Sequence, residues 1–187
     1  METKNLLPIR ILHDFAARIE KLDLAYMLTG SMAMMAYSVY RFTADVDVVL
    51  ELREADAKRI IETFEPDYYV PHNSVSRAIL SKRMFNLIHQ ETAFKIDCVM
   101  RKATDFQQSA FENRRKIDFY GGGIWIITKE DLIVSKLLWA KESRSEKQLS
   151  DVRSLILSGI DTPYVEDWTQ KLEIFDLFEE CRKEREE

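Results

Sequence analysis

The segment from residue 45 to residue 50, Asp-Val-Asp-Val-Val-Leu, limits the possible folds of this chain more than any other. Its β-branched apolar residues predict a strand. Because side chains on a strand alternate between the two faces of a sheet, Asp45 and Asp47 are expected on the same face. Two carboxylates that close repel each other unless protons or a cation compensate their charge. The pair is therefore suited to a hard cation such as Mg2+. The alternative is a solvent-facing strand with two harmless charges.

A turn that suits phosphate precedes this strand. The apolar run of residues 24–28 ends at Thr29-Gly30-Ser31, and the Met- and Ala-rich residues 32–40 follow. This pattern predicts a strand, a tight turn at Gly30 and a helix. Backbone N–H groups and the Ser31 hydroxyl at such a turn can bind phosphate oxygens. In the alternative interpretation, Gly30 only makes the turn and Ser31 only caps the helix.

A third acid lies in another apolar stretch. Residues 85–88 and 94–100 predict two strands joined by a polar link, and Asp97 lies in the second of them. A charged residue inside an apolar strand is costly without a partner. Three acids on neighbouring strands beside a phosphate-binding turn indicate phosphoryl chemistry with metal ions. Cys98, in the same stretch, is expected to be a small core residue.

The rest of the pattern predicts a mixed α/β chain. Gly121-Gly122-Gly123 indicates a hairpin or linker turn, and a capping box at residues 128–131 marks a helix start. We expect residues 1–127 to form the core and residues 128–187 to form a helical part packed on it as one compact unit. The apolar patterns predict helices over residues 8–22, 55–64, 106–115, 129–140, 146–157 and 162–178, and strands over residues 68–70 and 124–127.

Charge and cysteine content exclude some classes of protein. The chain has 27 basic and 32 acidic residues and a net charge of -5, which argues against a surface wholly committed to nucleic-acid backbone. Cys98 and Cys181 are far apart and belong to no CxxC or Cys/His cluster, which argues against a disulfide scaffold or a zinc site. Because we find no signal-peptide pattern and no run of 18 apolar residues, we expect a cytoplasmic protein with no membrane contact.

Gly30-Ser31 followed by residues 41–47, Arg-Phe-Thr-Ala-Asp-Val-Asp, resembles the signature of the nucleotidyltransferase (polymerase beta-like) superfamily. Within it, the chain is similar to AbiEii-type and related small bacterial nucleotidyltransferases. Residues 86–89 and 95–97 resemble the paired strands that bring up a third acid. Residues 130–136, with Arg144 and Asp151, resemble a later helix motif that carries Lys and Asp. Many relatives have an aspartate one turn before the position of Asp151, where this chain has Gln148.

The resemblance covers residues 24–157 and implies a polymerase-beta-like α/β (α+β) fold, a mixed sheet flanked by helices with further C-terminal helices. It also implies transfer of a nucleoside monophosphate from a nucleoside triphosphate (NTP) to a hydroxyl acceptor, with release of pyrophosphate. By the same resemblance, Asp45 and Asp47 would hold two Mg2+ ions, and Asp97 would complete one metal site and help to deprotonate the acceptor. Gly30 and Ser31 would hold the triphosphate. The other implied nucleotide contacts are Lys136, which would neutralise phosphate charge as a catalytic residue, and Asp151, which would position that lysine or contact the nucleotide.

Several alternatives remain open at this point. The acceptor could be a tRNA end, a protein hydroxyl or a small molecule such as an aminoglycoside, and the resemblance permits a toxin that pairs with an antitoxin. The rival from another class is a non-catalytic binding protein with the same fold that acts through a partner. Its signature would be a lost metal acid, yet all three acids are present. A phosphohydrolase fits poorly because the three histidines are scattered. Lys136 could instead be a surface lysine whose stem lies along apolar residues.

Overall fold

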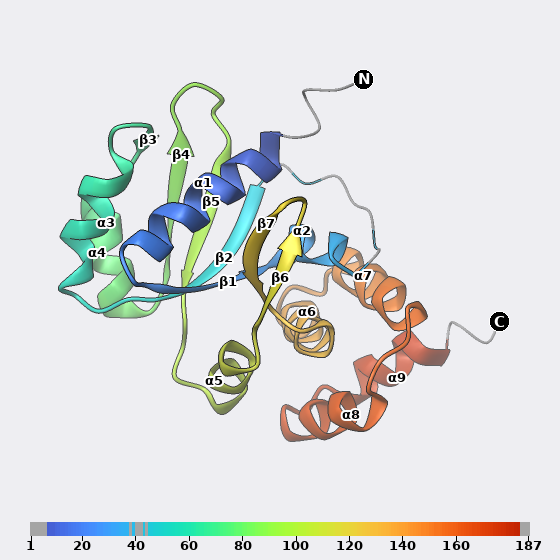
Figure 1. The fold of residues 1–187 in the computed structure, drawn as a ribbon. Helices are drawn as coiled ribbons and strands as arrows, with labels where there is room; N and C mark the ends of the chain where they lie inside the picture. The colour runs from blue at the N-terminus through green and yellow to red at the C-terminus, as the bar shows by residue number, and fades with distance from the viewer. Residues whose placement is uncertain (1–6, 38, 40–42, 44, 184–187) are drawn as a thin grey trace.

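The computed structural model describes residues 7–37, 39, 43 and 45–183. Within these residues the chain forms one mixed sheet of seven strands together with nine helices (Figure 1). The strands are β1 (Ala25–Thr29), β2 (Asp45–Glu51), β3 (Tyr68–Tyr69), β4 (Met84–His89), β5 (Lys95–Met100), β6 (Arg115–Phe119) and β7 (Gly122–Ile126). The helices are α1 (Leu7–Lys21), α2 (Gly30–Met35), α3 (Asp56–Phe64), α4 (His72–Ser81), α5 (Asp105–Glu112), α6 (Lys129–Ser143), α7 (Glu146–Leu157), α8 (Thr162–Lys171) and α9 (Phe175–Lys183).

The sheet has the strand order β3-β4-β5-β2-β1-β7-β6. Strand β2 lies at its centre, antiparallel to β1 and parallel to β5. Strand β4 is antiparallel to β5, and β7 is parallel to β1. The two acidic strands foreseen in the sequence, β2 and β5, are therefore direct neighbours. The mixed α/β fold predicted from the sequence is confirmed.

Strand β2 divides its residues between a core face and a polar face. Val46, Val48 and Leu50 are at most 1% exposed, whereas Asp45 and Asp47 are half-buried on the opposite side. This alternation is the expected result of a strand with one face against the core. Burial of the three apolar side chains fixes the register of β2, because a slip of one residue would bring both aspartates into the core. The core thus determines which face presents the acids.

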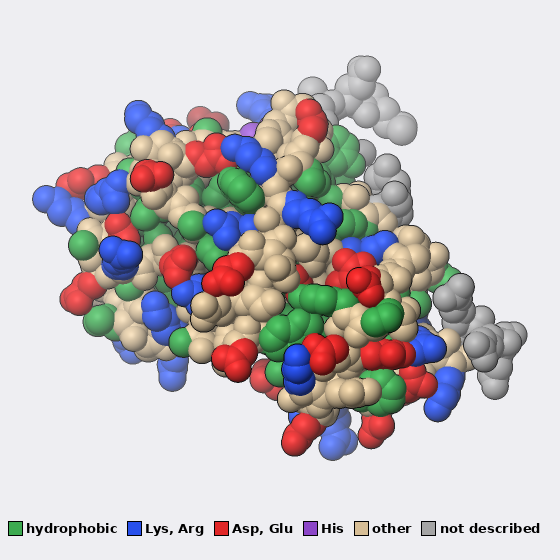
Figure 2. All heavy atoms as spheres, turned by 60° about the horizontal axis from the view of Figure 1, so that its bottom comes forward, with side chains coloured by type: hydrophobic (Ala, Val, Ile, Leu, Met, Phe, Trp, Pro, Cys, Tyr) green, Lys and Arg blue, Asp and Glu red, His purple; other side chains and the backbone are tan. Residues whose placement is uncertain are grey.

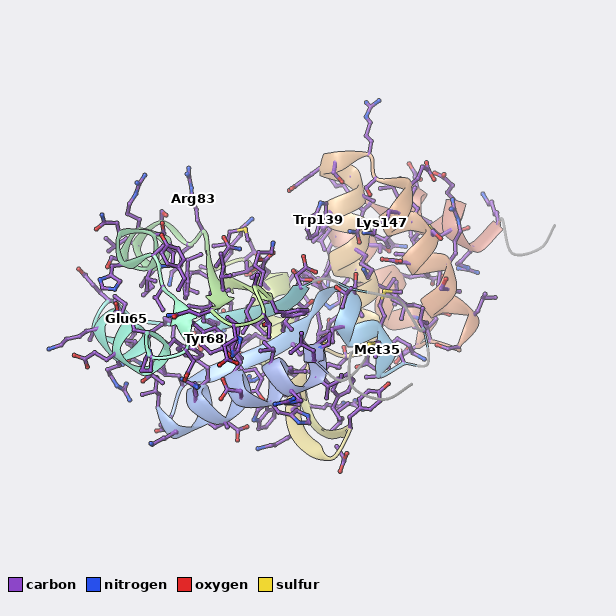
Figure 3. The ribbon with its side chains drawn as sticks, turned by 90° about the horizontal axis from the view of Figure 1, so that it is seen from above. Met35, Glu65, Tyr68, Arg83, Trp139 and Lys147 are labelled. Atoms are coloured by element: carbon purple, nitrogen blue, oxygen red, sulfur yellow. The ribbon has the colours of Figure 1, made fainter. Side chains whose placement is uncertain are left out.

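Helix α1 covers the middle of the sheet. Its residues Leu12, Phe15 and Ile19 are fully buried, and the helix packs against β1, β2 and β7. Figure 1 shows α1 lying across these strands. The C-terminal helices are gathered toward the lower right of the view. In the view from above, Trp139 on α6 and Lys147 on α7 mark these helices, and Met35 at the end of α2 lies on their side of the molecule (Figure 3). The contact between α2 and α6 connects the C-terminal helices to the turn after β1.

Some predicted elements differ from those in the structure. The helix expected over residues 106–115 ends at Glu112 as α5, and residues 115–119 form the edge strand β6. The long helix expected over residues 162–178 is divided into α8 and α9, with Glu173 between them at a φ of 55°. Helix α4 was not predicted at all. The helix expected over residues 32–40 ends at Met35 as α2, and Tyr40 lies outside the described residues.

The surface carries charges of both signs. On the face shown in Figure 2, blue and red side chains are interspersed over most of the visible surface. This mixture agrees with the near balance of 27 basic and 32 acidic residues. Across the described residues, none of the helices has both the length and the apolar character needed to cross a bilayer.

Candidate active site

The three acids predicted from the sequence lie side by side on the polar face of the sheet. Asp47 on β2 is in register with Asp97 on β5, and Asp45 lies two residues earlier on β2. Neighbouring strands are about 4.8 Å apart, so the two backbones hold these carboxylates within reach of one another. The same line continues to Thr29 on β1 and Asn86 on β4. A row of polar residues thus crosses four strands.

Each outer carboxylate of this group has a defined hydrogen-bond partner. The Thr43 hydroxyl donates to Asp45 Oδ1 at 2.9 Å. Asp97, which is 7% exposed, accepts from the Asn86 amide at Oδ1 and from Lys95 Nζ at Oδ2, the latter at 2.8 Å. Lys95 Nζ also lies 3.7 Å from Asp45 Oδ2. These contacts orient Asp45 and Asp97 and place an ammonium group between them.

The carboxyl group of Asp47 has a raised pKa. This pKa is raised from 3.8 to about 6; burial is the largest cause, the charges of Asp45 and Asp97 add to it, and those of Lys136 and Lys95 act in the opposite direction. Partial desolvation and two neighbouring carboxylates disfavour the ionisation of Asp47. The pKa of Lys95 is raised, mainly by its hydrogen bond to Asp97. The site therefore has an excess of negative charge that a cation would relieve.

Gly30 makes room for Asp47. It has a φ of +66°, and a Cβ at this position would lie 2.0 Å from Asp47 Oδ2. Glycine is thus needed both for the left-handed backbone and for the close approach of the carboxylate. Ser31 follows in the first turn of α2, whose N-cap is Thr29 with no side-chain cap hydrogen bond. The alternative in which Ser31 serves as the N-cap is therefore wrong.

Lys136 of α6 points into the protein. The residue is 5% exposed, and its Nζ donates to Asp151 Oδ2 at 2.8 Å and to Gln148 Oε1 at 3.2 Å, both on α7. Its charge lowers the pKa of Asp47, so it acts on the acidic row from the helical part. The alternative of a surface lysine is wrong. Gln148, where many relatives have an aspartate, takes part in the same contact.

Sequence reasoning missed the residues that orient the acids. Lys95, Asn86 and Thr43 were seen only as parts of motifs, with no role assigned to them. A signal for Lys95 was present, because Lys95 and Asp97 have the same two-residue spacing as Asp45 and Asp47 and therefore share a face. Arg41, the first residue of the resembling segment, lies outside the described residues.

The residues present fit a divalent cation in chemistry and in backbone position. Carboxylate oxygens are the ligands that Mg2+ prefers, and the register of β2 and β5 brings three carboxylates to one face. The side chains of Asp45 and Asp97 have other partners, however, and among the described residues no three such groups converge as metal ligands do. For all three carboxylates to bind one cation, their side chains would have to rotate, but the strands would not have to move.

Comparison with known proteins adds the family. A family described as "Nucleotidyltransferase of unknown function (DUF6036)" matches residues 9–185. No protein in a search of the curated sequences matches the chain.

Solved structures with similar folds include the antibiotic-resistance factor ANT(2'')-Ia, with a TM-score of 0.61, 15% identity and coverage of 92% of this chain and 93% of that one. An antigenic nucleotidyltransferase-like protein from Paracoccidioides brasiliensis gives a TM-score of 0.58 and 15% identity, covering 92% and 91%. A protein described as a nucleotidyltransferase, from Thermotoga maritima, gives a TM-score of 0.53 and 15% identity, covering 79% and 92%.

These likenesses show the fold. The family match spans nearly the whole described chain, including the acidic row, the Gly30 turn and the helix that carries Lys136. The narrower AbiEii-type assignment, the division at residue 127 and the roles of the individual residues stay predictions. The chain belongs to the nucleotidyltransferases, in the DUF6036 family.

Proposed function

We propose that the protein is a Mg2+-dependent enzyme that transfers a nucleoside monophosphate from an NTP to a hydroxyl group of an acceptor. The observation that carries this proposal is the polar row across the sheet. Asp47 and Asp97 lie in register on neighbouring strands, and Asp47 is packed against Gly30 of the turn after β1. The carboxylates that could bind a cation therefore lie next to the turn that could bind phosphates.

The chain's own residues have distinct tasks in this proposal. Asp45, Asp47 and Asp97 would hold Mg2+, which when bound supplies charge that orients the triphosphate and stabilises the in-line displacement. Gly30 would let the backbone approach the phosphates closely, and Ser31 would offer them its hydroxyl group. Lys136, held by Asp151 and Gln148, adds a fixed positive charge on the side of the helices. Its held position means that little motion is needed when phosphate charge develops.

The acceptor is proposed as a class defined by its hydroxyl. RNA ends, protein side chains and small molecules all fit this chemistry, and pairing with an antitoxin is compatible with the first two. An aminoglycoside is included among the acceptors that are tried, as a small molecule with several hydroxyl groups.

The test uses the position of a radioactive phosphorus atom. Each of the four NTPs, labelled at the α-phosphate, is incubated with the protein and Mg2+ in the presence of RNA, of the protein alone, or of an aminoglycoside. Monophosphate transfer moves the α-label to the acceptor and leaves a γ-label in pyrophosphate. Movement of the γ-label instead would indicate a kinase and contradict the proposal.

Two variants connect the activity to the site. Asp47→Asn keeps the shape of the side chain but removes one charge, and transfer is expected to fall by orders of magnitude, because metal-assisted displacement depends on the number and placement of ligands. Asp167→Asn, on the exposed face of α8, removes a carboxylate whose partner is Lys171 and serves as the matched control. A binding protein without catalysis would show no transfer in any form and unchanged partner affinity in Asp47→Asn.

A further inference from the structure

We propose that Lys95 competes with the divalent cation for Asp97, so that the third metal ligand becomes available only when the lysine is displaced. This inference rests on the proposed function, since it concerns the same site. It assigns a positioning role to Lys95, whose positive charge is opposite to that of the carboxylate ligands.

The contacts of Asp97 leave neither of its oxygens without a partner. Oδ1 accepts from the Asn86 amide, and Oδ2 accepts from Lys95 Nζ at 2.8 Å. The same Nζ lies 3.7 Å from Asp45 Oδ2, so the ammonium stands between two of the three acids. A cation that bridged Asp45 and Asp97 would need this place. Two positive groups cannot share it, because they repel each other and need the same oxygen.

Lys95 is the member of the pair that can move. Its side chain is 41% exposed, whereas the side chain of Asp97 is 11% exposed and is held on its other oxygen by Asn86. Ion pairs with one exposed partner contribute little to stability, so a divalent ion can replace this lysine without a large opposing free energy. The displaced ammonium group would then be solvated by water, while Asp97 would keep its position on β5.

The lysine also links metal binding to nucleotide binding. Without nucleotide, the positive charge of Lys95 opposes the approach of a metal ion to the three acids. A triphosphate adds negative charge and further oxygen ligands, which favours the metal over the lysine. The metal at Asp97 is therefore expected to bind much better with nucleotide than without it. Removal of the lysine charge should weaken this coupling.

The experiment measures Mn2+ binding by electron paramagnetic resonance, with and without an ATP analogue that has a methylene group between the α- and β-phosphates. Without nucleotide, Lys95→Met is expected to bind Mn2+ about 2–5-fold more tightly, as for the loss of one partly exposed competing charge. With the analogue, the difference between parent and variant should shrink. Lys95→Arg keeps the charge and should stay near the parent.

Lys116→Met is the matched control. Lys116 on β6 is 45% exposed and pairs with Glu20 at 2.9 Å, so this variant removes a similar lysine from the far edge of the sheet. Its Mn2+ affinity should equal that of the parent. Thermal unfolding of each variant, measured alongside, shows that the binding differences come from folded protein.

A double-mutant cycle with Asp97→Asn separates competition from a general field effect. If Lys95 acts by occupying Asp97, then Lys95→Met tightens Mn2+ binding in the parent but not in the Asp97→Asn background. Equal tightening in both backgrounds would overturn the inference. A parent that binds Mn2+ as tightly as Lys95→Met would also overturn it while leaving the proposed function intact. Absence of Mn2+ binding by every form, with and without nucleotide, would overturn both.

Discussion

Gly30 connects the backbone of the turn to the geometry of the acids. Replacement by alanine would place a methyl group at 2.0 Å from Asp47 Oδ2 and strain a backbone with a φ of +66°. We expect Gly30→Ala to lose about 1–2 kcal/mol of stability from the left-handed conformation alone. Mn2+ binding and NTP transfer should fall far more than this loss of stability explains, because Asp47 must move.

Gly159→Ala provides the comparison for this prediction. Gly159 has a φ of +78°, and a Cβ there would meet nothing within 4 Å. The variant should lose similar stability in urea unfolding yet keep metal binding and transfer. If Gly30→Ala kept Mn2+ affinity at the parent level, the close packing of Gly30 on Asp47 would have no functional meaning.

The raised pKa of Asp47 has a consequence for stability against pH. The unfolded chain loses this proton near pH 3.8, whereas the folded protein holds it until about pH 6. Between these values the folded state binds more protons, so in the absence of divalent ions this group makes stability fall as pH rises from about 4 to 6.

Asp47→Asn, a neutral mimic of the protonated form, should remove this dependence. The variant should gain about 1–3 kcal/mol over the parent at pH 8, where a shift of one pKa unit corresponds to about 1.4 kcal/mol before screening by solvent. At pH 4 the two proteins should be nearly equal. Urea unfolding at pH 4, 6 and 8 in a chelator measures the difference, and an equal gain at pH 4 and 8 would contradict the pKa as its cause.

Helices α6 and α7 are joined by the buried pair of Lys136 and Asp151. Asp151→Leu leaves an ammonium inside the protein with Gln148 as its remaining described partner on α7, and we expect a loss of about 2–4 kcal/mol. Lys136→Met with Asp151→Leu should recover most of this stability, because a buried ion pair can often be replaced by apolar residues of similar volume.

The double variant separates the structural role of Lys136, which joins α6 and α7, from its proposed role in binding the triphosphate. The double variant should be folded and stable, yet it should bind triphosphate more weakly than the parent, because the charge near Asp47 is gone. Isothermal titration with NTP and Mg2+ measures this affinity. Unchanged affinity in the stable double variant would mean that Lys136 only joins the helices.

Elements with a strong local signal were predictable from the sequence, and those defined by their neighbours were not. The period-two pattern of β2 and the capping box of α6 identified both elements within a few residues. Edge strand β6 was missed because its residues Arg115, Lys116 and Asp118 are exposed and charged, so only pairing with β7 makes it a strand. Helix α4 buries only Val75, Ala78 and Ile79, a short stripe that gives a weak periodicity.

The same distinction applies to the site. Asp45, Asp47 and Asp97 could be found because charges in apolar strands are conspicuous. The contact of Lys95 with Asp97 and the approach of Asp47 to Gly30 depend on side-chain directions and on strand pairing. The two-residue spacing of Lys95 and Asp97 predicts only that they share a face, and no local pattern in one segment predicts that they form a hydrogen bond or that Asp47 approaches Gly30.

The core runs through both proposed parts of the chain, from α1 to α9, so we expect the described protein to unfold as one unit. Phe178 of α9 is fully buried. Phe178→Ala should lose about 3–5 kcal/mol. Because the parts are expected to be coupled, the loss should appear equally in the sheet and in the helices.

Tryptophan fluorescence can follow each part, since Trp125 lies in β7 and Trp168 in α8. Variants of the parent and of Phe178→Ala in which Trp139 and one of these two reporters are replaced should give coincident unfolding curves in urea. An early transition seen only at Trp168 would show that residues 128–183 unfold on their own.

The row across four strands also bears on how the protein is made. Its members, Thr29, Asp47, Asn86 and Asp97, are scattered over nearly 70 residues, and the contact of Lys136 with Asp151 lies further along the chain. A growing chain on the ribosome cannot hold the complete centre until residue 151 has left the exit tunnel. Under the proposed function, incomplete products of translation that end before α7 would lack the contact of Lys136 with Asp151, so we expect transfer to begin only after α7 docks.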